Sequence, residues 1–134
     1  METEIMRFCR AFQRNIGDDM PIRVSQFAVL NIMCTVPGPH VPAALADRLH
    51  VSKAMISSHI AALMRCGLIV RVPSPEDGRS VYLVSTKRGV ALVEKFNAAN
   101  QKKLDMLAVQ MGQSRFNNFM KLIAIANKAL DNCV

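Results

Sequence analysis

The chain has 134 residues, of which 51% are hydrophobic and 20% charged, with a formal net charge of +7. This length and balance fit a single globular domain over residues 1–134 and exclude an intrinsically disordered chain. No stretch approaches the ~18 uncharged apolar residues of a membrane span, and the charged first residues resemble neither a secretion signal nor a transit peptide, so we expect a cytoplasmic protein with no membrane partner.

Two helices are predicted before residue 40. The first covers residues 3–16, where apolar side chains recur at the spacing of one helix face. These side chains are Ile5, Phe8, Cys9, Phe12 and Ile16. The second runs from about Ser25 to Val36 and is stopped by the following Pro37-Gly38-Pro39. Its inward side chains are predicted to be Phe27, Leu30, Ile32 and Met33.

The next segment predicts two short helices joined by a tight turn. The first begins near Val41, with Pro42 suited to the first helical position, and ends at Leu49. The second runs from Lys53 to about Cys66, because Ser52 is a good N-cap and Gly67 a good C-terminal stop. Its apolar side carries Ile56, Ile60 and Leu63. This arrangement is typical of a helix-turn-helix.

A β-hairpin is predicted directly after these helices. Residues 68–72 and 80–84 are rich in β-branched side chains, and residues 73–79 between them carry turn chemistry that includes Asp77-Gly78. The hairpin has a charged tip, so we interpret it as a wing attached to the helix-turn-helix.

The remaining chain is predicted to form two helices. Ser85 or Thr86 caps a helix that ends near Met111, and residues 112–114 break it before a final helix. The final helix has a wide apolar face that needs a partner. We expect a two-fold dimer in which residues 3–16 and 90–134 of each chain interlock. The alternative is an antiparallel helical hairpin closed within one monomer.

Positive charge gathers in the middle of the chain. Residues 41–89 carry seven basic and three acidic side chains, whereas the four basic and four acidic side chains of residues 1–40 balance. A basic segment of this kind favours a polyanionic partner.

The four cysteines do not indicate a metal site. Cys9, Cys34, Cys66 and Cys133 form no CxxC pair and have no metal-finger spacing to a histidine. We expect no metal, no cofactor and no disulfide, with the thiols packed as small hydrophobic groups.

The middle segment resembles the MarR family of bacterial transcription regulators over residues 24–89. The matching stretches are Leu45-Ala46-Asp47-Arg48-Leu49, Val51-Ser52-Lys53, Ile56-Ser57, Leu63, Gly67-Leu68-Ile69 and Asp77-Gly78-Arg79 with the run that follows to Gly89. The resemblance implies a mainly α fold with a small β-wing (α+β). It also implies a winged helix-turn-helix lobe over 24–89, dimerisation helices over 3–16 and 90–134, and a homodimeric repressor on a pseudo-palindromic DNA operator.

The helix that begins at Lys53 is the predicted DNA-reading element. Its outer side chains, which are small or polar enough to let the backbone approach a major groove, are Lys53, Ala54, Ser57, Ser58, Ala61 and Ala62. Ser52 and Lys53 direct N–H groups and a cation toward phosphate. Arg79 at the wing tip is predicted to enter a minor groove, and by resemblance Asp77 orients it. Arg65, Arg71, Lys87 and Arg88 are candidate phosphate anchors.

The chain departs from the family pattern at several positions. Ala54 and Ser58 replace longer hydrogen-bonding residues, which moves specificity toward Ser57, the wing and DNA shape. His50 stands where the family often has Gly. Val41 and Arg23 stand where the family often has a capping hydroxyl.

The resemblance also implies a sensed signal. One hypothesis is a small lipophilic or phenolic effector bound near Phe8, Phe12, Met33 and Val93, against the alternative that these four are ordinary core. A second hypothesis is a redox-sensing repressor that uses Cys9, whose neighbours Arg7 and Arg10 favour a thiolate.

Two other functional classes are a protein-interaction module and an enzyme. A winged helix also serves as a protein-interaction module, but the basic segment and the small outer face favour DNA. No nucleophile elbow, phosphate-binding glycine loop or catalytic Cys–His spacing is present, so we expect no enzyme.

Overall fold

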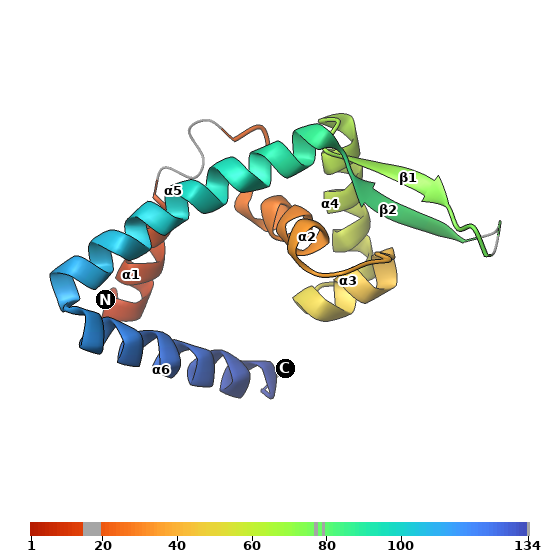
Figure 1. Cartoon of the computed structure of the whole chain (residues 1–134). Helices are drawn as coiled ribbons and strands as arrows, with labels where there is room; N and C mark the ends of the chain where they lie inside the picture. Colours follow the sequence, from red (N-terminus) through yellow and green to blue (C-terminus); the bar gives the residue numbers. More distant parts are fainter. Residues whose placement is uncertain (15–19, 77, 79, 134) are drawn as a thin grey trace. The chain divides into compact units, whose positions relative to one another are not determined.

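The computed structural model describes residues 1–14, 20–76, 78 and 80–133. The elements follow in the order α1 (Glu4–Gln13), α2 (Val24–Thr35), α3 (Pro42–Leu49), α4 (Lys53–Arg65), β1 (Ile69–Pro73), β2 (Val81–Ser85), α5 (Lys87–Met111) and α6 (Gln113–Asp131) (Figure 1). The chain divides into two compact units, unit 1 (Met1–Phe96) and unit 2 (Asn97–Val134). The predicted fold class is confirmed: the protein is mainly helical with one small antiparallel sheet.

The helix-turn-helix forms where the sequence predicted it. The Ser52 hydroxyl accepts a hydrogen bond from the Met55 N–H at 3.1 Å, so α4 begins at Lys53 with a side-chain cap. His50 ends α3 in the left-handed region with φ 54°, the position at which the family often has Gly. Gly67 ends α4 with φ 71°, as expected of a C-terminal glycine.

The core of unit 1 is aliphatic and gathers side chains from α2, α3, α4, the wing and the start of α5. Its fully buried large side chains are Val29, Leu30, Leu45, Ile56, Ile60, Leu63, Leu68 and Ile69. Phe27, Leu30 and Met33 of α2 point inward as predicted. The prediction for Ile32 was wrong in part, because Ile32 is half-buried and Val29 is completely buried in its place.

The wing is a two-stranded antiparallel sheet in which Ile69 pairs with Ser85 and Pro73 with Val81. Figure 1 shows the two strands running side by side away from the end of α4. Both strands begin one residue later than predicted. The segment before α3 is tied to the sheet because the Leu83 N–H donates to the His40 carbonyl at 2.9 Å.

The start of α5 is fixed to the winged-helix lobe. The Thr86 hydroxyl donates to the Gly67 carbonyl at 2.7 Å and accepts from the Gly89 N–H at 3.1 Å, so Thr86 is the predicted cap. A Cβ at residue 89 would collide with the Leu68 carbonyl oxygen, and only glycine allows this approach. Two turns further on, the Phe96 ring packs against Phe27 with ring centroids 4.1 Å apart.

The terminal helices differ from the lobe in having no buried side chain. α1 begins after the N-cap Thr3, ends at Gln13 rather than at the predicted residue 16, and has no buried residue. Ile16, the last residue of the predicted helix, lies outside the described residues. In unit 2, α6 has no buried residue either. Its exposed large apolar side chains are Met120, Leu122, Ile125 and Leu130.

Candidate nucleic-acid interface

α4 has two unlike sides. Ile56, Ile60 and Leu63 are at most 1% exposed and anchor the helix in the core. The opposite side is solvent-exposed and carries the predicted reading residues Lys53, Ala54, Ser57, Ser58 and Ala61. Ala62 does not belong to this side: it is 7% exposed, because it lies next to Leu63 on the edge that packs against the core. The side chains on this exposed side are small or polar, so the helix backbone can come close to a ligand.

The N-terminal end of α4 is suited to an anion. Helix N-termini carry partial positive charge on free N–H groups. The first turn of α4 has no acidic residue to neutralise this charge, and Lys53 adds a full positive charge there. Ser52 and Lys53 are both exposed, so a phosphate would reach this end of the helix from solvent.

The predicted phosphate anchors remain available to a partner. Arg65, Arg71, Lys87 and Arg88 are all exposed, and in the parts of the chain that the structure describes none of them forms an ion pair. They come from the end of α4, from β1 and from the first turn of α5. Basic side chains that form no ion pair within the protein are available to bind an external anion.

The tip of the wing lies partly outside the described residues. Asp77 and Arg79 are among those that are not described, so their predicted roles stay predictions. The base of the loop is well defined, because the Ser74 N–H donates to the Ser80 carbonyl at 2.9 Å. The Ser74 hydroxyl accepts from the Glu76 N–H at 3.3 Å, and Ser74 is only 5% exposed. Ser74 lies in the predicted turn, where serine beside proline is common, but no sequence pattern indicated that its side chain would be buried and would organise the loop.

A second residue that sequence reasoning missed is Arg23. It is exposed at the N-cap of α2 and lines an open hollow of about 540 Å³ that also includes Ser58 and Arg65. In the sequence Arg23 looked only like a weak cap. Its placement beside α4 depends on how α2 packs against α4, which a linear pattern does not reveal.

The four candidate effector residues lie in two different surroundings. Met33 and Val93 are 6% and 3% exposed and belong to the core of unit 1. Phe8 and Phe12 stack on each other along α1 with ring centroids 5.9 Å apart. The assignment of an effector site to these four stays a prediction.

All four cysteines are free, and their packing differs from the prediction. Cys9 and Cys133 are exposed, whereas Cys34 and Cys66 are half-buried. The expectation that the thiols pack as small hydrophobic groups was therefore wrong for Cys9 and Cys133. α1 buries none of its side chains in this chain, so its apolar stripe leaves the thiol in solvent.

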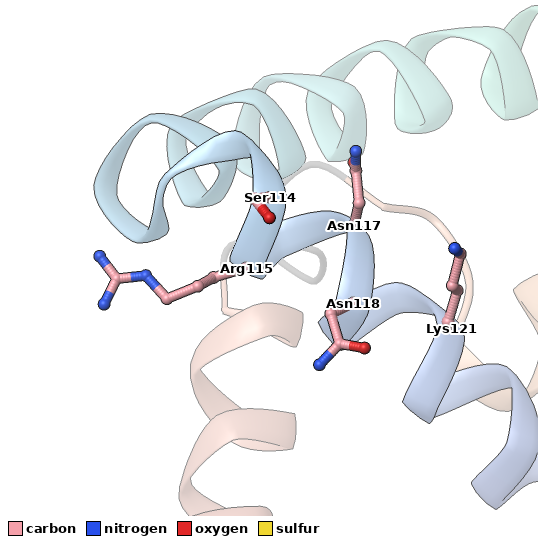
Figure 2. Close-up of a pocket in the computed structure, with 5 residues that line it drawn as sticks. All are labelled: Ser114, Arg115, Asn117, Asn118 and Lys121. Atoms are coloured by element: carbon pink, nitrogen blue, oxygen red, sulfur yellow. The ribbon is translucent and has the colours of Figure 1, made fainter.

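Unit 2 has a hollow of its own at the start of α6. Ser114, Arg115, Asn117, Asn118 and Lys121 line about 500 Å³ of open space there. Figure 2 shows the Arg115 side chain directed away from Lys121. The Arg115 Nε–H donates to the Met111 carbonyl at 2.6 Å, so this guanidinium serves the turn between α5 and α6.

The described residues include no metal-ligand cluster and no membrane-spanning helix. In residues 1–14, 20–76, 78 and 80–133, no three side chains among His, Cys, Asp and Glu gather as metal ligands. In the same part of the chain, no helix is both long enough and apolar enough to cross a membrane.

Comparisons with known proteins agree with this geometry. The model of the MarR family matches residues 19–80. A helix-turn-helix transcriptional regulator of Mycobacterium tuberculosis is 33% identical over 100 residues, which cover 75% of this chain and 68% of that protein. An uncharacterized regulator of the same type from Mycobacterium leprae matches with the same identity and coverage.

Solved structures share the fold at lower identity. FabT of Streptococcus pneumoniae, solved in complex with DNA, superposes with a TM-score of 0.76 and 18% identity over 93% of this chain and 85% of FabT. PcaV of Streptomyces coelicolor, solved with its natural ligand, superposes with a TM-score of 0.70 and 20% identity over 94% of this chain and 88% of PcaV.

Proposed function

The chain belongs to the MarR family of DNA-binding transcription regulators, and from that premise we propose that it is a homodimeric repressor of a pseudo-palindromic operator. In this proposal the two α4 helices of the dimer read half-sites about one helical turn apart, roughly 34–36 Å. A bound signal then releases the protein from DNA. The expected place of action is the cytoplasm.

The observation that carries the proposal is the two-sided character of α4. One side is locked into the core by Ile56, Ile60 and Leu63, so the orientation of the helix is fixed. The other side exposes Lys53, Ser57 and the small Ala54, and the helix begins with a capped, positive N-terminus. A rigid helix with a small outer face fits the width of a major groove.

The experiment is a binding titration with duplex DNA that flanks the coding region of this protein. Specific retardation at nanomolar concentration supports the proposal, and the salt dependence of affinity reports how many phosphates are contacted. Lys53→Ala is expected to lower the slope of log K against log salt by about one. Binding that ignores both the DNA sequence and Lys53 would contradict the assignment of α4.

The wing supplies the second predicted contact. Arg79→Ala is expected to weaken binding by at most a few kcal/mol and to reduce discrimination at the A·T pairs flanking the half-sites. The neighbouring Gly78 is exposed, and a Cβ at this position would meet no atom within 4 Å, so this side of the residue is open to a DNA partner. If Arg79→Ala bound duplexes with A·T flanks as tightly as the unmodified protein does, the wing would be removed from the mechanism.

The exposed apolar side chains of unit 2 support the homodimer. Leu122, Ile125 and Leu130 are 55–65% exposed on α6, and Val109 of α5 is 79% exposed. Apolar side chains in such numbers on one helix pair mark an association surface. A second copy of this chain is the occupant that a two-fold operator requires.

Two inputs are proposed for the release step. The first is a small lipophilic or phenolic effector near Phe8, Phe12, Met33 and Val93, and PcaV with its natural ligand supports an effector in a related protein. The second is oxidation of Cys9, which is favoured by the exposure of this thiol. If peroxide releases the unmodified protein from DNA but does not release Cys9→Ser, the signal is assigned to the Cys9 thiol. If both proteins are released alike, oxidation of Cys9 is excluded as the signal.

A further inference from the structure

The hollow beside α4 brings together two arginines from different helices. Arg23 and Gln26 line it from the start of α2, and Ser58 and Arg65 line it from α4. The rest of its lining consists of Met20, Pro21, Ile22, Ala62 and Cys66. The Cys66 thiol reaches the Pro21 carbonyl at 3.9 Å, so the segment before α2 and the end of α4 meet at this hollow.

The hollow is electropositive. Within the described residues neither Arg23 nor Arg65 forms an ion pair, and α2 and α4 contain no aspartate or glutamate. The Gln26 side-chain oxygen accepts from the Arg23 N–H at 3.0 Å, which holds the backbone of the N-cap. A guanidinium only donates, so the Arg23 side chain makes no cap hydrogen bond and is left for another acceptor. Asp18 and Asp19 precede it in sequence and lie outside the described residues.

The hollow also continues the outer face of α4. Ala54, Ser58, Ala61 and Arg65 follow one another at spacings of four, three and four residues, and all four are exposed. They form one stripe along the helix, and the hollow opens beside its C-terminal half. A helix about 10–12 Å wide fills a major groove about 12 Å wide, so the DNA backbone must run along its flanks.

We propose that Arg23 and Arg65 together hold one backbone phosphate of the operator in this hollow. The inference rests on the proposed DNA binding and deepens it: Arg23 becomes a DNA-contacting residue that α2 contributes to the interface. Guanidinium forks bind phosphate oxygens in pairs, and two forks from two helices fix the phosphate relative to both. The contact therefore sets how deeply and in which register α4 enters the groove.

The test compares salt slopes for the full-length protein on an operator duplex between about 50 and 200 mM salt. Arg23→Ala and Arg65→Ala are each expected to lower the slope by about one. The double variant is expected to lower it by about one as well, because the phosphate is held only when both guanidinium groups are present and is already lost in either single variant. Lys95→Ala, an exposed cation on α5 away from the hollow, is the matched control and is expected to leave the slope unchanged. A double variant that loses two units, or an unchanged slope in Arg23→Ala, overturns the shared phosphate.

A free anion is the other source of the same chemistry. Inorganic phosphate titrated into the DNA-free protein distinguishes the two. If phosphate binding depends on Arg23 while Arg23→Ala leaves the salt slope of DNA binding unchanged, the hollow binds a small anion and the proposal is overturned. Thermal unfolding of each variant is measured alongside, and because Arg23 and Arg65 are exposed we expect unchanged midpoints.

Failure of the inference is separable from failure of the proposed function. If the unmodified protein binds no duplex, the proposed function fails. If it binds with a slope that depends on Lys53 but not on Arg23, the function stands and only the shared phosphate is rejected.

Discussion

The two units of this chain differ in how far they bury their apolar side chains. Unit 1 encloses Leu30, Ile56 and Leu63 completely and is held together by its own core. Unit 2 carries many apolar side chains, yet no residue of α6 is buried. The lobe that is to meet DNA is therefore a self-sufficient body, whereas α6 leaves its apolar side chains in solvent, as the homodimer proposed above requires.

The largest expected effect breaks unit 1. Leu30→Ala removes a side chain with no solvent exposure from the contact between α2 and the rest of the core. We expect a loss of about 2–5 kcal/mol in the free energy of unfolding, because the cavity adds to the lost transfer free energy. Urea unfolding measures it. Leu122→Ala on α6, 55% exposed, is the matched control. Equal losses of unfolding free energy in both variants, measured at a concentration where the chain is monomeric, would contradict the conclusion that only unit 1 has a buried core.

The next effect concerns unit 2. Ile125→Glu places a charge at a position that is 65% exposed in the single chain and buried in the proposed dimer. Burying an unpaired carboxylate is costly, so we expect the dimer to dissociate at least tenfold more readily. Sedimentation at several concentrations measures this change. Lys128→Glu, an exposed polar site on the same helix, separates a general charge effect from loss of the apolar contact. A dimer that tolerates Ile125→Glu would exclude this face of α6 from the interface.

A smaller effect lies at the junction of the core and the DNA face. Ser52→Ala removes the hydroxyl that accepts from the Met55 N–H at 3.1 Å. We expect a loss of about 1 kcal/mol in stability. Ser52→Asp keeps the acceptor and is expected to restore stability while weakening DNA binding, because it adds a negative charge where phosphate is to bind. If Ser52→Asp bound DNA as tightly as the unmodified protein, no phosphate would lie at this helix end.

The contrast between the units also explains what could be predicted from the sequence. Caps and stops are local, so Ser52, Thr86 and Gly67 were identified correctly from neighbours a few residues away. α2 is apolar on nearly every side, so periodicity could not choose between Val29 and Ile32. Residues 68–72 are almost uniformly β-branched or apolar, which gives no signal for the first residue of the strand.

The candidate site was predictable in part for the same reason. The exposed side of α4 follows from helical spacing, and only Ala62 at its edge was misplaced. Arg23 is 42 positions before Arg65 in the chain, and only packing of α2 on α4 brings both to one hollow. Long-range neighbours of this kind have no signature in a linear pattern.

The smallest expected effect is a gain in stability within unit 1. His50 ends α3 with φ 54° and ψ 44°, where a Cβ is crowded by the following carbonyl. Compared with His50→Ala, which also lacks the imidazole, His50→Gly removes the crowding but adds freedom to the unfolded chain, so we expect the glycine variant to be more stable by about 0.5–1 kcal/mol. His50→Ala keeps the Cβ and loses the imidazole, and is the control that isolates the backbone term. A glycine variant no more stable than the alanine variant would show that backbone strain at residue 50 does not limit the stability of this turn. This turn matters for function because α3 and α4 are joined there, and the angle between them sets how α4 is presented to DNA.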